Sequence, residues 1–192
     1  MKNLILILLT IALMFGSCNK DDDDVVPNSS NTWTKTFGGN FNDKGSSVQQ
    51  TIDGGYIIHC YYGGNDVYLI KTDENGNESW NQNFGQINIG NGDESVEQTI
   101  DLGYIIAGSI ESFGNGGNDV YLIKTDENGD SLWTKTFGGT EDDYGTSVQQ
   151  TNDGGYIISG ITFTPGIGSR IYLLKTNENG IELWNKTIGQ SG

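Results

Sequence analysis

Residue types that build reactive or cross-linked sites are scarce in this chain. Its 192 residues include two cysteines, one histidine, and 10 lysines and arginines against 25 aspartates and glutamates. The resulting net charge of −15 at pH 7 disfavours nucleic acid and other phosphate-rich partners. The single histidine, His59, stands beside Cys60 with no further histidine or cysteine nearby, so the pair does not make a zinc site. We therefore expect neither nucleic-acid binding nor a zinc centre.

Sequence motifs of catalysis are also missing. The chain has no serine nucleophile elbow, no second histidine and no phosphate-binding glycine loop leading into a helix. Asp142 and Asp143 form a carboxylate pair of the kind that glycosidases use, but acidic residues are so common here that such pairs arise by chance. We predict no catalytic residue, no cofactor and a non-catalytic role.

The apolar run near the start of the chain is too short to cross a bilayer as a helix. It covers residues 4–15, whereas a membrane-spanning helix needs about twenty residues. Lys2 precedes the run and two small residues, Gly16 and Ser17, follow it, which is the pattern of a secretory signal peptide. We predict that residues 1–17 are such a signal.

The residue that follows this signal is Cys18. The sequence Phe-Gly-Ser-Cys at 15–18 resembles the lipobox of bacterial lipoproteins, although a leucine usually stands where this chain has Phe15. The resemblance implies that Cys18 carries a lipid that anchors the protein to a membrane. The alternative is an ordinary signal peptide followed by an incidental cysteine.

An acidic stretch follows Cys18. Four consecutive aspartates at 21–24 repel one another and have nothing apolar to bury, so we predict that residues 18–31 are a disordered tether. The cluster resembles the surface-export signal of some Gram-negative lipoproteins, which implies an outer-membrane protein on the cell surface. A plain acidic spacer would look the same and leaves the choice of leaflet open. With Cys18 lipidated, Cys60 has no disulfide partner, and we predict a small buried residue there.

A unit of roughly fifty residues is repeated along the rest of the chain. An extra tryptophan segment opens the series, and successive tryptophans are 47, 53 and 51 residues apart. A period of this length is close to that of propeller blades, in which each unit buries its apolar face against its neighbours. The tryptophan segments lie at 33–38, 80–85, 133–138 and 184–189.

Four strand-like segments recur in the same order in each unit. A Ser-Val-x-Gln-Thr segment is followed by Gly-Tyr-Ile-Ile, by a Tyr-Leu segment that ends in lysine, and by the tryptophan segment. Tyr, Ile, Val and Trp favour strands, and the Asp-Gly-Gly and Glu-Asn-Gly sequences between them favour hairpin turns. No segment shows helical periodicity, so we predict an all-β chain.

The third segment, its Glu-Asn-Gly turn and the tryptophan with a trailing glycine resemble the tryptophan-docking pattern of quinoprotein-type β-propeller repeats. The resemblance covers residues 33–192. It implies a repeat domain at 32–192 with three four-stranded blades at about 40–85, 86–138 and 139–189, plus one extra N-terminal strand. Quinoprotein dehydrogenases close a ring of more blades around a cofactor, and no position here matches a cofactor ligand.

Three units leave the closure of the propeller open, because propellers typically have four to eight blades. The chain is a shortened member of a longer family, an open stack, or half of a six-bladed ring made by two chains. An open stack exposes strand edges that invite association, so a homo-oligomer or a protein or glycan partner is expected.

The turn at 126–130 has alternating oxygen ligands around a glycine, as calcium loops do. Asp126, Asn128 and Asp130 are therefore weak metal candidates. The corresponding turn at 177–181 lacks both aspartates, and a hairpin turn explains the pattern without a metal. We predict no metal.

Exposed aromatic residues are expected near the loops of variable length that join the second and third segments, where they could stack on a sugar ring. The candidates are Tyr61, Tyr62, Phe113 and Tyr144, and simple loop packing is the alternative. The sequence thus favours a surface-anchored lipoprotein with a non-catalytic binding or scaffolding domain. The alternative is a remnant or partial quinoprotein-like or carbohydrate-active enzyme.

Overall fold

The computed structural model describes residues 32–40, 42–62, 66–86, 94–111 and 117–189. The signal, Cys18 and the acidic tether lie outside these residues, as does Phe113. All described strands lie within residues 33–192, which form one compact unit. Among the described residues no helix is long and apolar enough to cross a membrane.

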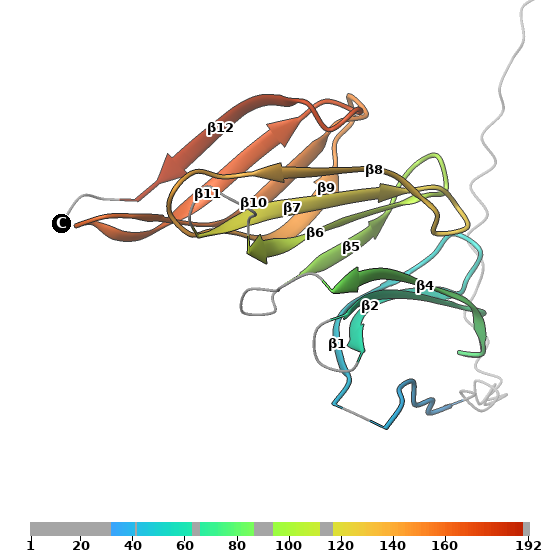
Figure 1. The fold of residues 1–192 in the computed structure, drawn as a ribbon. Coiled ribbons are helices and arrows are strands. Elements are labelled where there is room, and N and C mark those ends of the chain that lie inside the picture. Colours follow the sequence, from blue (N-terminus) through green and yellow to red (C-terminus); the bar gives the residue numbers. More distant parts are fainter. Residues whose placement is uncertain (1–31, 41, 63–65, 87–93, 112–116, 190–192) are drawn as a thin grey trace, which may run out of the picture. The chain divides into compact units, whose positions relative to one another are not determined.

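The described strands form three four-stranded sheets, each made of consecutive antiparallel strands (Figure 1). Sheet A comprises β1 (Lys44–Gln50), β2 (Tyr56–Tyr62), β3 (Asp66–Thr72) and β4 (Glu78–Gln86). Sheet B comprises β5 (Ser95–Gln98), β6 (Tyr104–Glu111), β7 (Asn118–Thr125) and β8 (Ser131–Phe137). Sheet C comprises β9 (Asp143–Gln150), β10 (Tyr156–Thr164), β11 (Gly168–Thr176) and β12 (Glu182–Ile188). The expected all-β, propeller-like array of three four-stranded blades is confirmed.

The same hairpin turn joins the first two strands of each sheet. In the first turn of sheets A and C a glycine takes positive φ, at Gly54 (84°) and Gly154 (81°). Each of these turns is closed by the same backbone hydrogen bond, for example from Thr51 N to Gly55 O at 2.9 Å. In sheet B the equivalent residue is Leu102, which has a φ of 68° and is the one described non-glycine residue with positive φ. The turn chemistry that the sequence predicted is therefore present, with one strained copy.

Apolar side chains from facing sheets form the cores. Between sheets A and B, Ile57 and Leu69 pack against residues of β5, β6 and β7. Between sheets B and C, Ile105 and Leu122 pack against residues of β9, β10 and β11. Each internal junction therefore consists of two faces. The upstream face belongs to the sheet that comes earlier in the chain, and the downstream face belongs to the sheet that follows it. The second and third strands supply both, which explains why their apolar residues run without alternation.

A tryptophan docks each unit onto the next. Trp80 of sheet A contacts Tyr104 of sheet B edge-on, with ring centroids 5.7 Å apart, and Trp133 of sheet B contacts Tyr156 of sheet C at 5.9 Å. The same tryptophans cover the turn glycines, because a Cβ on Gly129 would stand 2.7 Å from Trp80 and one on Gly180 would stand 2.8 Å from Trp133. Only a residue without a side chain allows this approach at positive φ.

The extra N-terminal strand expected at 33–38 is not formed, since residues 32–39 have no regular secondary structure. In each complete unit the tryptophan strand pairs with the strand before it, as β4 pairs with β3. The described residues contain no such strand before residue 33. The tryptophan of this segment is nevertheless docked like the others: Trp33 meets Tyr56 edge-on at 5.8 Å and covers Gly76. Lys35 Nζ donates a hydrogen bond to Asn77 Oδ1 at 2.9 Å.

Candidate functional site

The aromatic residues predicted to line a ligand rim do not form one. Tyr61 was expected to be exposed and is buried, packed edge-on against His59 at 5.4 Å, because it faces sheet B from β2. Tyr144 lies in β9 and contacts Phe163 edge-on at 6.1 Å. Its hydroxyl accepts a hydrogen bond from Asn118 Nδ2 at 3.1 Å. The Tyr62 side chain and Phe113 lie outside the described residues.

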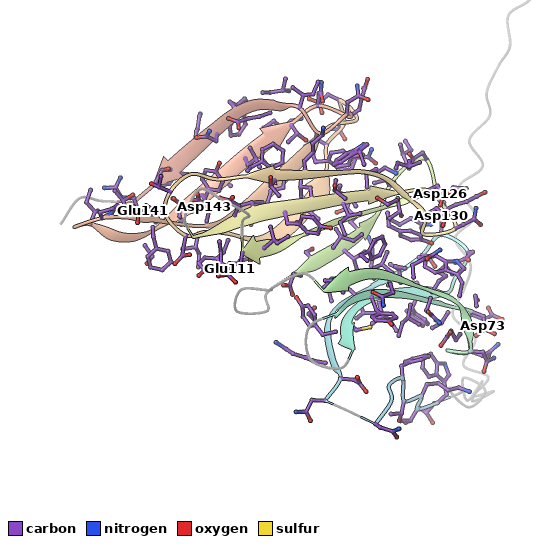
Figure 2. All side chains as sticks on the ribbon, in the orientation of Figure 1. Asp73, Glu111, Asp126, Asp130, Glu141 and Asp143 are labelled. Atoms are coloured by element: carbon purple, nitrogen blue, oxygen red, sulfur yellow. The ribbon has the colours of Figure 1, made fainter. Side chains whose placement is uncertain are left out.

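The weak calcium candidates are used by their own turn, which joins β7 to β8 (Figure 2). Asp126 Oδ1 accepts backbone hydrogen bonds from Asn128 and Asp130, both at 2.9 Å. The Asp130 carboxylate accepts a bond from Gln82 Nε2 of sheet A at 3.0 Å. The described residues contain no group of three or more His, Cys, Asp or Glu side chains placed to hold a metal ion. Turn formation and inter-sheet contact therefore account for these oxygens.

The neighbouring carboxylates of Asp142 and Asp143 have different environments. Asp142 accepts hydrogen bonds from Asn118, from its backbone N at 2.7 Å and its Nδ2 at 3.0 Å, and these bonds lower its pKa. Asp143 is buried and accepts a bond from Gly139 N at 3.1 Å. Burial is the main cause of its raised pKa, and the charges of Asp119 and Asp142 add to it. Both carboxylates serve the junction between sheets B and C.

A cluster of three polar side chains, Ser46, His59 and Glu94, lies where β1 and β2 meet sheet B. Ser46 Oγ and His59 Nδ1 share a hydrogen bond of 2.8 Å, and His59 is fully buried. Burial lowers the His59 pKa to about 4. Glu94, which enters β5, is also buried; burial raises its pKa to about 7, while Lys44 and Ser46 act to lower it. Neither Glu94 oxygen nor His59 Nε2 has a hydrogen-bond partner of ordinary geometry among the described residues.

The connectivity of this group differs from that of a hydrolytic triad. In a triad the base accepts the serine proton through one ring nitrogen while a carboxylate holds the other. Here His59 Nε2 has no hydrogen bond to a carboxylate among the described residues, and the ring is sealed from solvent. At the junction of sheets B and C the corresponding positions hold Ala107 and Thr146. His59 and Glu94 thus replace a small pair at one junction, a packing role that sequence reasoning missed because the two residues are far apart in the chain.

An open cleft of about 600 Å³ lies on the outer face of sheet A. Trp33 and Phe37 of the N-terminal segment form one wall, and Val48, Tyr56 and Ile58 of β1 and β2 form the other. Lys35, Ser46 and Ser47 add polar groups to its rim. The cleft therefore combines aromatic and aliphatic surface with a few hydrogen-bonding groups, as binding sites commonly do.

The opposite end of the array, on sheet C, is also uncovered. Every residue of β12 is exposed, and Trp184 contacts no tyrosine of a following unit among the described residues. Lys186 Nζ lies instead 5.3 Å from the Trp184 ring centroid. The fourth copy of the tryptophan segment is the sequence signal that could have identified this end, because the other three tryptophans dock onto a tyrosine and Trp184 does not among the described residues.

Comparison with known proteins leaves the family open. No family model matches the chain, and no curated protein matches it. A crystal structure of a protein of unknown function from Bacteroides caccae is similar over 76% of this chain and 68% of that chain, at 10% sequence identity and a TM-score of 0.40.

Proposed function

We propose that the protein is a surface-anchored lipoprotein whose β-repeat domain is a non-catalytic binding or scaffolding module. The observation that supports the binding role best is the state of the two end sheets. Side chains that are buried at both internal junctions are repeated on the outer faces of sheets A and C, where they remain exposed. Exposed apolar surface of this kind marks interaction sites.

The anchor rests on the sequence at 15–18 and the acidic stretch behind it. A single acyl chain binds membranes only marginally, whereas the several chains of a bacterial lipoprotein cysteine hold a protein stably. Two partners follow from this arrangement: a membrane that holds the lipid, and a protein or glycan that meets the repeat domain.

The anchor is tested by partition of the full chain, expressed in a Gram-negative host, between detergent and aqueous phases. The parent protein should enter the detergent phase and Cys18→Ser should remain in the aqueous phase. Protease added to intact cells should remove the parent domain if it lies on the surface. Equal partition of the parent and Cys18→Ser would contradict the lipid anchor, and full protection of the domain would contradict its surface location.

The non-catalytic role is tested with chito- and cello-oligosaccharides, which aromatic clefts commonly bind. Tryptophan fluorescence reports binding, because Trp33 lies in the wall of the cleft. Mass spectrometry of the same mixture reports cleavage. We expect the sugars to be recovered intact, and the appearance of shorter sugars would replace the binding role with a carbohydrate-active enzyme.

A further inference from the structure

We propose that a second copy of this chain docks head to tail, so that the outer face of sheet C in one copy covers the outer face of sheet A in the other. This inference names the partner of the two open faces and therefore rests on the proposed binding role. Four features of the junctions between sheets carry it: tryptophan docking, apolar exposure, side-chain bonds to the backbone, and charge.

A tryptophan docks onto the following sheet at both internal junctions, whereas Trp184 of sheet C has no following sheet among the described residues. Trp80 and Trp133 each cover a tyrosine and a turn glycine of the following sheet. Trp184 stands at the same position of sheet C, paired with Lys175 in the ladder as Trp133 is with Lys124. The matching acceptor on sheet A consists of Tyr56 and Gly76. A following copy would thus offer Trp184 the same surface that its counterparts use.

Apolar side chains follow the same rule. On the downstream faces Val96 and Val148 are 5% and 2% exposed, whereas Val48, their counterpart on sheet A, is 64% exposed. On the upstream faces Val120 is fully buried, whereas its counterpart on sheet C, Ile171, is 56% exposed. Each open face therefore carries the residue type that the other face buries within the array. Burial of such side chains is the main favourable contribution in association.

Side-chain bonds to the backbone also repeat at each internal junction. The N–H of Gln98 donates to Gln49 Oε1 at 2.5 Å, and the N–H of Gln150 donates to Glu97 Oε1 at 3.0 Å. The residue in the upstream position on sheet C is Gln149, which is exposed and again carries an amide oxygen. Its counterpart in a following copy is the N–H of Gln50. Head-to-tail docking would therefore repeat the pattern of the two internal junctions, in which a Gln or Glu side-chain oxygen accepts this backbone bond.

Charge makes the proposed contact more favourable than the internal one. At the junction of sheets B and C the carboxylates of Asp119 and Asp143 both surround Gly138. The counterpart of Asp119 on sheet C is Arg170, which packs against Gly189, and its Nε is buried without a hydrogen-bond partner among the described residues. The counterpart of Asp143 on sheet A is Asp43. Head-to-tail docking would thus bring a guanidinium to a carboxylate where the internal junction holds two carboxylates.

The Tyr56 surface of sheet A is already covered by Trp33, so docking of a second copy requires residues 33–38 to move. The segment 33–38 reads Trp-Thr-Lys-Thr-Phe-Gly and 184–189 reads Trp-Asn-Lys-Thr-Ile-Gly, so both fit the Tyr56 surface. The first has no strand pairing, whereas β12 is paired with β11. Displacing residues 33–38 therefore breaks fewer hydrogen bonds, and β12 of the second copy takes their place. Two copies joined at both ends make six blades, within the range of closed propellers, and leave no end face open.

Native mass spectrometry of the full chain, released from detergent micelles, tests the proposal. We expect a dimer. Val48→Asp damages the sheet A face, and Arg170→Asp or Ile171→Asp damages the sheet C face; each variant alone should weaken the dimer at least tenfold. Ile100→Asp is the matched control, because Ile100 is 90% exposed on a turn of sheet B, and it should leave the dimer unchanged. Thermal unfolding of each variant confirms that it folds.

A mixture of variants distinguishes head-to-tail docking from a symmetric contact. Val48→Asp chains keep an intact sheet C face and Arg170→Asp chains keep an intact sheet A face. An equal mixture can form one undamaged junction, so a one-to-one heterodimer should reappear. A monomeric parent chain, a dimer that survives both variants, or a mixture that stays monomeric would each overturn the proposal. Cys18-dependent partition is unaffected by any of these outcomes, so failure of the docking and failure of the anchor are separable.

Discussion

Lys124 of β7 is almost completely buried, and its Nζ lies 3.0 Å from Oδ2 of Asp101, which belongs to the turn between β5 and β6. The same ammonium donates to the carbonyl oxygen of Thr125 at 2.7 Å. Gly103 makes room for this arrangement, because a Cβ there would overlap that carbonyl oxygen and stand 2.6 Å from Lys124 Nζ. Sheets A and C repeat the clamp with two further pairs, Lys71 with Asp53 and Lys175 with Asp153.

The first prediction concerns this clamp. Asp101→Ala should destabilise the protein by about 1–3 kcal/mol, because it removes a charge-assisted hydrogen bond from a buried ammonium, and solvent at the half-exposed Asp101 side offsets part of the loss. The double variant Asp101→Ala with Lys124→Met should be less destabilised than Asp101→Ala alone, since it removes the unpaired charge. Urea unfolding of the parent, Asp101→Ala, Lys124→Met and the double variant measures the coupling. Lys135→Met, an exposed lysine of the same sheet, is the control and should change stability by less than about 0.5 kcal/mol.

Strictly additive effects of Asp101→Ala and Lys124→Met would contradict the clamp. In that case the carboxylate would act only through its turn, where it also bonds the Thr99 hydroxyl and Gly103 N.

The clamp illustrates which parts of the fold the sequence could predict. Strand order, turns and tryptophan docking follow from local patterns that repeat, and the structure bears out the all-β array. The burial of Lys124 does not follow from any such pattern, because a lysine at the end of a strand is normally solvated. Its partner Asp101 is 23 residues away and meets it only once the hairpins have formed.

The candidate site was predicted less well for a related reason. Tyr61 was placed on an exposed rim because it precedes a variable loop, yet its position in β2 turns it toward sheet B. Ser46 contacts His59 of its own sheet and Glu94 of sheet B, and this depends on which sheets face each other, which a single unit of sequence does not contain. The strand expected at 33–38 failed because a strand needs a neighbour, and sequence pattern alone does not supply one.

The second prediction concerns the strained turn of sheet B. Leu102 holds a positive φ that its counterparts Gly54 and Gly154 adopt without steric cost. Leu102→Gly should therefore stabilise the protein by about 0.5–1 kcal/mol, with an upward shift in the thermal unfolding midpoint. Gly154→Leu, the reverse change at an equivalent turn, should lower stability by about 1–2 kcal/mol. Loss of stability in Leu102→Gly would show that the turn is not strained.

The third prediction concerns acid unfolding. Hydrogen bonds from Lys71 and Thr51 lower the pKa of Asp53 to about 2, and bonds from Thr151 and Lys175 do the same for Asp153. A carboxylate with a lowered folded-state pKa contributes stability above its ordinary pKa of 3.8, and that contribution is lost as the pH falls toward 2. Stability should thus fall between about pH 4 and pH 2. Asp53→Asn should flatten this fall, and an unchanged slope in urea titrations at each pH would contradict the assignment.

The fourth prediction concerns the opposed pH dependences of His59 and Glu94. The folded-state pKa of His59 is about 4 instead of 6.5, so its contribution is lost as the pH falls from 6.5 to 4. The folded-state pKa of Glu94 is about 7 instead of 4.5, so its contribution is complete below pH 4.5 and is lost as the pH rises through 7. The two effects partly cancel in the parent protein, which should show a nearly flat stability profile between pH 5 and 6.5.

Glu94→Gln separates the two effects. It replaces the carboxyl with a neutral group of similar size, so it should match the parent at pH 4.5 and exceed its stability at pH 8 by about 1–3 kcal/mol. The difference should grow as the pH rises through the Glu94 pKa of about 7. Glu127→Gln, on an exposed turn of sheet B, is the control and should show no such growth. A Glu94→Gln protein that is less stable than the parent at pH 8 would mean that the buried carboxylate is charged and paired, in contrast to the neutral packing role that its raised pKa predicts.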